Sequence, residues 1–139
     1  MQNSKNCLEN LSFKQYGTNK LFSFTYLERL HIQSDFNEVF KNGLKLENKK
    51  IKILAYKRND GKSLRRLGLV TSRKIGTAVV RNRTKRRLRE IFRTNKHLLE
   101  PSLDLIFISK RETTLLNYND LKNAVLGLLT KAKLCTLQD

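Results

Sequence analysis

The chain has 139 residues, of which 39% are hydrophobic, enough for one hydrophobic core but hardly for two. Its 29 lysines and arginines outnumber 12 acidic residues and give a formal net charge of +17, which predicts a polyanionic partner, nucleic acid first. A merely solvated basic surface or an anionic membrane surface is the alternative. No run of 18 apolar residues and no secretory signal pattern occurs, so we expect no membrane span and a cytoplasmic protein.

Residues 1–24 are rich in Asn, Lys and Ser and show no sustained periodicity, so we predict a flexible N-terminal extension. A single domain should then occupy residues 25–134, followed by a short tail at 135–139. Cys7 and Cys135 lie at opposite ends of the chain in no metal-ligand spacing, so neither a disulfide framework nor a zinc site is predicted.

The first predicted helix begins at Ser34, a favourable N-cap residue, and ends at Gly43. The alternating pattern of residues 50–57 predicts a strand, and an extra short strand between this helix and that strand is left open. The Asn-Asp-Gly sequence at 59–61 predicts a turn, after which residues 67–71 are expected to form the partner strand.

A long helix without Pro or Gly is predicted from Thr77 to about Lys96, with one apolar side formed by Val80, Thr84, Leu88, Ile91 and Phe92. Residues 103–109 predict a short apolar strand, and Asn117 or Asn119 should cap a last helix. The resulting order, α-β-β-α-β-α, predicts an α/β sandwich in which helices pack on one sheet.

The long helix and the residues just before it are strongly basic. Between residues 73 and 93 the only acidic residue is Glu90, whereas nine residues are basic. These nine are Arg73, Lys74, Arg81, Arg83, Lys85, Arg86, Arg87, Arg89 and Arg93. Arginine predominates, which favours bidentate phosphate contacts and stacking on bases, and so RNA over duplex DNA. The alternative is a solvated helix face, but such a face usually has acidic partners one turn away.

The segment at residues 72–76 supplies a hydroxyl, two cations and a glycine beside the N-terminus of the long helix, where a phosphate is favoured. A simple strand-to-helix turn is the alternative for Gly76.

No constellation of catalytic or metal-binding residues is found in the sequence. His31 and His97 stand in different elements, and the acidic residues are scattered singly, as Glu28, Asp35, Glu38, Glu47 and Asp60 illustrate. We expect these acids to be surface or capping residues, and we predict neither a catalytic residue nor a metal ligand.

The sequence from Ser72 to Arg93, SRKIGTAVVRNRTKRRLREIFR, resembles the signature of bacterial ribonuclease P proteins, which centres on Arg-Asn-Arg followed by Lys-Arg on a helix. The likeness covers roughly residues 26–133 and includes Arg29-Leu30, Phe36, Phe40, Gly43, Leu67-Gly68-Leu69 and residues 104–108. It implies a central sheet with a left-handed β-α-β crossover around the arginine helix, although general handedness rules predict the opposite hand.

The resemblance also implies two RNA-binding surfaces. The one for the catalytic RNA would consist of Arg81, Asn82, Arg83, Lys85, Arg86 and Arg89. The one for the single-stranded 5′ leader of precursor tRNA would consist of Phe36, Phe40, Leu54, Tyr56, Ser72, Arg73 and Lys74. Leu54 stands where the family commonly has an aromatic residue, with Tyr56 on the same strand face. Aromatics spaced like Phe36 and Phe40 are otherwise more often core residues.

The function that follows from the resemblance is assistance in the endonucleolytic removal of the 5′ leader. Cleavage would depend on Mg²⁺ bound mainly by the RNA, with ribonuclease P RNA and precursor tRNA as partners and no obligatory protein partner. A general or ribosomal RNA-binding protein without a role in cleavage is the first alternative, and a protein-only nuclease is the second.

Overall fold

A mixed β-sheet of four strands organises the chain, whose computed structural model describes residues 23–135. The strands are β1 (Leu44–Glu47), β2 (Ile51–Lys57), β3 (Arg66–Val70) and β4 (Leu103–Ser109). Their order across the sheet is β1-β2-β4-β3, with β1 and β4 antiparallel to β2 and with β3 parallel to β4. β1 and β3 are therefore the two edges.

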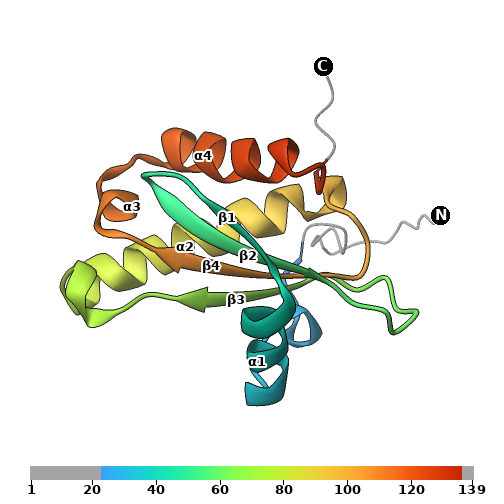
Figure 1. The fold of residues 1–139 in the computed structure, drawn as a ribbon. Helices are drawn as coiled ribbons and strands as arrows, with labels where there is room; N and C mark the ends of the chain where they lie inside the picture. Colours follow the sequence, from blue (N-terminus) through green and yellow to red (C-terminus); the bar gives the residue numbers. More distant parts are fainter. Residues whose placement is uncertain (1–22, 136–139) are drawn as a thin grey trace, which may run out of the picture.

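Helices cover both faces of this sheet (Figure 1). α1 (Gln33–Asn42) lies on one face, while α2 (Ala78–Asn95) and α4 (Tyr118–Lys131) lie on the other. The short helix α3 (Arg111–Leu115) connects β4 to α4. Within residues 23–135, none of these helices combines the length and the apolar content that crossing a bilayer requires.

The alternation of side chains along β2 divides the core in two. Ile51, Ile53 and Ala55 belong to the larger cluster under α2 and α4, whereas Leu54 belongs to the smaller cluster under α1. β4 is buried on both faces, as the continuous apolar sequence of a central strand requires.

The α/β sandwich and the order of its main elements are confirmed, and β1 is the extra short strand that the sequence left open. The sequence did not predict α3. The prediction that residues 67–71 pair with the strand at 50–57 is wrong, because β4 lies between β2 and β3 and pairs with both. The handedness of the β3-α2-β4 crossover stays a prediction.

The N-terminal boundaries also differ from expectation. α1 begins at Gln33 with Ile32 as its N-cap residue, so Ser34 lies inside its first turn. Residues 1–22, most of the predicted extension, lie outside the described residues, as does Cys7. Phe24, predicted to end that extension, instead packs its ring edge-on against Phe92 at a centroid distance of 5.6 Å.

Two glycines allow close approaches that fix α1 on the sheet. Gly43 ends α1 as predicted, and a Cβ there would clash with the carbonyl oxygen of Val39 in α1 and lie 3.3 Å from that of Ala55 in β2. A Cβ on Gly68 of β3 would lie 2.7 Å from Cζ of Phe36. The Phe36 ring therefore rests directly on the backbone of the edge strand.

Replacing Gly68 tests this contact. Gly68→Ala should destabilise the protein by about 1–3 kcal/mol, because the added methyl group must displace the Phe36 ring. Urea unfolding measures the change. Gly127→Ala is the matched control: nothing lies within 4 Å of its Cβ position in α4, so this change should stabilise by about 0.5–1 kcal/mol. An unchanged midpoint for Gly68→Ala would contradict the contact.

Candidate RNA-binding surfaces

The burial of one side of α2 fixes the direction in which its cations point. Thr77 caps the helix by accepting a hydrogen bond from the backbone N–H of Val80 at 3.3 Å. The buried residues of the helix are Thr84, Leu88, Ile91, Phe92 and Asn95. Four of these were predicted, while Val80 is only half-buried and Asn95 was not predicted. Most of the remaining helix surface is basic.

The six residues predicted to bind the catalytic RNA all lie on α2 outside this buried stripe. Asn82, Arg83 and Arg86 are exposed, whereas Arg81, Lys85 and Arg89 are half-buried. Within residues 23–135, none of these six side chains forms a salt bridge. We call these six residues the α2 ridge. Its cations are available for an external anion.

Two other basic residues of α2 are engaged within the protein. Arg87 donates a hydrogen bond to the carbonyl oxygen of Leu116 at 2.8 Å and so fastens α2 to the segment after α3. Arg93 pairs with Glu90 at 2.5 Å. The set of nine cations seen in the sequence therefore includes residues with structural contacts as well as residues that face solvent.

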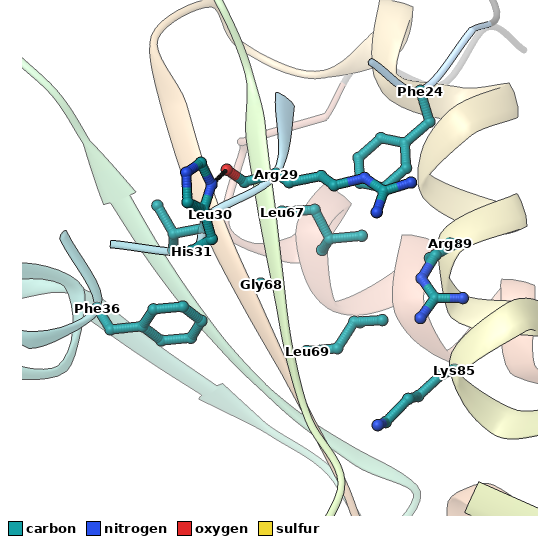
Figure 2. Close-up of a pocket in the computed structure, with 10 residues that line it drawn as sticks. All are labelled: Phe24, Arg29, Leu30, His31, Phe36, Leu67, Gly68, Leu69, Lys85 and Arg89. Atoms are coloured by element: carbon teal, nitrogen blue, oxygen red, sulfur yellow. Dashed lines mark hydrogen bonds between the residues drawn. The ribbon is translucent and has the colours of Figure 1, made fainter. Parts of the chain in front are cut away.

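A groove of about 230 Å³ lies at the open edge of β3. Figure 2 shows Phe36 on one side of the strand that contains Gly68, with Lys85 and Arg89 of α2 on the other side. The groove is also lined by Phe24, Arg29, Leu30, His31, Leu67 and Leu69. An aromatic ring and several cations thus border one groove, a combination suited to single-stranded nucleic acid.

Residues 23–30, which we call the strap, form one wall of this groove. The backbone N–H of Leu30 donates to the carbonyl oxygen of Leu67 at 2.9 Å, which attaches the strap to the edge of β3. His31, just after the strap, hydrogen-bonds the Tyr26 hydroxyl and the Arg29 carbonyl oxygen, each at 2.9 Å. Of the strap, the sequence analysis noted the likeness at Arg29-Leu30, to which it assigned no role, and Glu28, which it expected at the surface or in a cap.

A buried ion pair anchors the strap to the end of α2. Lys96 donates to the Glu28 carboxylate and to the carbonyl oxygen of Ser23, and Glu28 and Lys96 are only 7% and 8% exposed. Thr25 completes a capping box with Glu28 through hydrogen bonds of 2.9 and 3.0 Å. Burial opposes ionisation of Glu28, but the hydrogen bonds from Lys96 and Thr25 outweigh it and lower the pKa of Glu28.

The predicted aromatic residues of the leader surface lie on and beside α1. The rings of Phe36 and Phe40 have centroids 6.5 Å apart and planes inclined by 25°. Phe36 is half-buried on the sheet, whereas Phe40 is 44% exposed. Tyr56 is half-buried on the same sheet face, where a hydrogen bond to Glu38 raises the pKa of its hydroxyl. Of these three rings, that of Phe40 is the most exposed.

Leu54 is a correction to the predicted leader surface. It is 1% exposed and belongs to the core cluster beneath α1, because β2 is covered on both faces at this point. A residue so placed supports α1 but offers no surface to RNA.

Ser72, Arg73 and Lys74, which follow β3, are exposed, as a surface role requires. Ser72 accepts a hydrogen bond from the backbone N–H of Lys74 at 3.3 Å and caps a short 3-10 turn, Arg73–Ile75. Arg111 of α3 holds this turn by donating to the carbonyl oxygen of Lys74 at 3.2 Å. The β3-edge groove contains Phe36 but none of Ser72, Arg73 and Lys74.

Several carboxylates of the described residues are paired with arginines. Asp104, only 2% exposed, accepts hydrogen bonds from Arg58 at 2.6 Å and from Arg66 at 2.7 and 2.8 Å. Asp35, expected at the surface or in a cap, pairs with Arg66 at 3.1 Å. Within residues 23–135, no three His, Cys, Asp or Glu side chains are arranged to hold a metal ion. Glu28 does cap a turn, as expected, but it is buried.

Comparisons with known proteins agree with the sequence resemblance. Residues 24–133 match the protein family described as Ribonuclease P. The ribonuclease P protein component of Thermotoga maritima is 41% identical over 90 residues, which cover 65% of this chain and 75% of that protein. The corresponding component of Finegoldia magna is 36% identical over 104 residues, or 75% of this chain and 89% of that one.

Solved structures give the same result for the fold. The RNase P protein of Staphylococcus aureus superposes with a TM-score of 0.71 at 27% identity, covering 78% of this chain and 98% of that chain. The RNase P protein of Thermotoga maritima superposes with a TM-score of 0.66 at 34% identity, covering 75% and 96%. The match to the family spans the strap, the sheet and all four helices.

The buried Glu28–Lys96 pair predicts that the free energy of unfolding depends on pH. Glu28→Gln should destabilise the protein by about 3 kcal/mol at pH 7, because it leaves the Lys96 charge buried without a carboxylate. The pKa of Glu28 is held below its ordinary value of 4.5, so the advantage of the wild type is complete above that pH. The advantage should shrink as the pH falls through the lowered pKa.

Urea unfolding of both proteins at pH 7 and pH 3 measures this effect. Glu47→Gln is the control, because Glu47 forms an exposed pair with Lys110 and its loss should change stability little. Equal destabilisation by Glu28→Gln and Glu47→Gln at pH 7 would contradict the anchoring role of Glu28.

Proposed function

This chain belongs to the ribonuclease P protein family and is thus the protein subunit of a tRNA-processing endoribonuclease, and we propose that the α2 ridge binds the catalytic RNA of that enzyme. The observation that supports this assignment is the row of ridge cations that no carboxylate of residues 23–135 neutralises. Arg83 and Arg86 are exposed and suited to bidentate phosphate contacts. The α2 ridge would then contact successive phosphates of one RNA backbone.

The same proposal assigns the surface beside α1 to the 5′ leader of precursor tRNA. The exposed ring of Phe40 and the neighbouring Phe36 present aromatic faces on which any base can stack, so many leader sequences can be bound. The exposed Arg73 and Lys74 supply phosphate contacts beyond the end of β3.

In this proposal Mg²⁺ is held mainly by the RNA, and the protein contributes binding energy rather than a catalytic side chain. Most carboxylates of the domain are paired with arginine or lysine, as Asp104 and Glu28 illustrate. The protein screens phosphate repulsion between the two RNAs and holds the leader. A cytoplasmic location follows from the cytoplasmic synthesis of precursor tRNA.

Reconstitution tests the function. A bacterial ribonuclease P RNA, this protein and both together are incubated with precursor tRNA at low and moderate Mg²⁺. Cleavage at the mature 5′ end should require the RNA, and the protein should enhance it at low Mg²⁺. The double variant Arg83→Ala/Arg86→Ala should bind the RNA more weakly, with a salt slope lower by about one for each lost phosphate contact.

Other outcomes of this reconstitution decide between the alternatives. Cleavage by the protein alone would show a protein-only nuclease. RNA binding without any enhancement would show a general or ribosomal RNA-binding protein. A double variant with the wild-type salt slope would remove the α2 ridge from the RNA interface.

A second test addresses leader binding. Phe40→Ala should weaken binding of precursor tRNA to the assembled enzyme by about 5- to 150-fold, the equivalent of one stacked base at about 1–3 kcal/mol. Binding of mature tRNA, which lacks the leader, should not change. Phe40→Leu keeps an apolar side chain without a ring and should also lose affinity. Wild-type affinity in Phe40→Leu would exclude stacking on this residue.

A further inference from the structure

A second hollow, of about 460 Å³, lies beside the C-terminal half of α2. The strap contributes Ser23, Phe24 and Arg29 to its lining, and α2 contributes Arg86, Arg89, Glu90 and Arg93. Phe24, Arg29 and Arg89 also line the β3-edge groove, so the two hollows adjoin. Figure 2 shows Arg29 extending over the Phe24 ring toward the side on which Arg89 lies.

The charges around this hollow are unbalanced. Four guanidinium groups face one carboxylate, and that carboxylate, on Glu90, accepts hydrogen bonds from Arg93 at 3.1 and 2.5 Å. Within residues 23–135, Arg29, Arg86 and Arg89 have no salt bridge. Like charges gathered around one hollow repel each other, and an anion placed between them converts that repulsion into attraction.

The strap holds Arg29 in this position from both sides. Glu28 before it is fixed by Lys96, and Leu30 after it is buried and hydrogen-bonded to Leu67. The Arg29 guanidinium lies 5.2 Å from the centroid of the Phe24 ring, a cation–π distance that leaves its N–H groups available. Because the side chain is already ordered, binding a ligand costs little further conformational entropy.

We infer that Arg29 joins Arg86 and Arg89 in a phosphate-binding site that the strap completes at the C-terminal half of α2. Its ligand is a backbone phosphate of RNA, since arginines suit bidentate contacts with phosphate oxygens. This inference rests on the proposed RNA-binding function and adds to it a residue outside α2. It also gives the buried Glu28–Lys96 pair a role, which is to hold one of the phosphate ligands in place.

The test uses Arg29→Met in the full-length chain, because methionine keeps an apolar stem over Phe24 and removes the charge. Lys45→Met is the matched control: it removes the same charge from an exposed position on β1, the opposite edge of the sheet from β3. Binding is measured as a function of salt, first to a bacterial ribonuclease P RNA alone. The assembled enzyme is then measured with precursor tRNA and with mature tRNA.

Arg29→Met should bind RNA about tenfold more weakly at low salt and lower the salt slope by about one, while Lys45→Met should match the wild type. Loss in the first measurement identifies the RNA subunit as the source of the phosphate, and loss with precursor tRNA alone identifies the leader. The Arg29→Met and Arg89→Met effects should be less than additive in the double variant, because both residues contact one phosphate.

The inference is overturned if Arg29→Met and Lys45→Met behave alike in all measurements while the wild type binds RNA. An Arg29→Met variant that loses thermal stability but keeps the wild-type salt slope also overturns it, because Arg29 would then only cover Phe24. Failure of the proposed function is distinguishable, since in that case the wild type itself would not bind or assist the ribonuclease P RNA.

Discussion

Burial of the narrow apolar side of α2 against the sheet is the interaction on which the rest of the molecule depends. Leu88, Ile91 and Phe92 are almost fully buried, and they hold in place a helix whose other faces are dominated by like charges. Those charges oppose helix formation in isolation, so tertiary packing has to stabilise the helix. The helical period fixes the direction of each basic side chain relative to the buried stripe. When the stripe packs on the sheet, the basic side chains of α2 therefore point outward, away from the core.

The distribution of acidic residues strengthens this effect. Asp104 binds both Arg58 and Arg66, its hydrogen bonds raise the pKa of Arg66, and Asp35 of α1 contacts the same arginine. These pairs join α1, β3 and β4 on the face of the sheet away from α2. Carboxylates used there are not available to neutralise the α2 ridge. The fold thereby separates the charges of one chain into a paired region and an unpaired one.

What the sequence could predict depended on whether the determining pattern was local. The α2 stripe and the β4 strand follow from periodicity within one segment, and the predicted bounds of both agree with the structure to within a residue or two. The pairing of β3 with β4 depends on residues far apart in the chain, so the Asn-Asp-Gly turn suggested the wrong partner. The burial of Leu54 likewise requires knowing that α1 covers β2 on the second face.

The strap could be predicted from the sequence only in part. Its Thr25-x-x-Glu28 capping box is a local pattern that the sequence already contained, and it would have placed a turn within the segment before α1. The partner of Glu28 could not be found this way, because Lys96 follows α2 and meets Glu28 only after the helix has packed on the sheet. The inferred phosphate site, built from Arg29 and α2, could therefore not be predicted from periodicity, although each of its residues is visible in the sequence.

The position of β3 at the edge of the sheet explains how the two proposed RNA-binding surfaces meet. Phe36 lies on one face of this strand and Lys85 and Arg89 approach from the other, with only one strand between them. Gly68 keeps that strand thin, because any side chain there would push Phe36 away from it. An internal strand would have a neighbour at this place, and the ring and the cations would then belong to separate surfaces. The edge position, set by the insertion of β4 beside β2, lets aromatic and cationic groups border one groove.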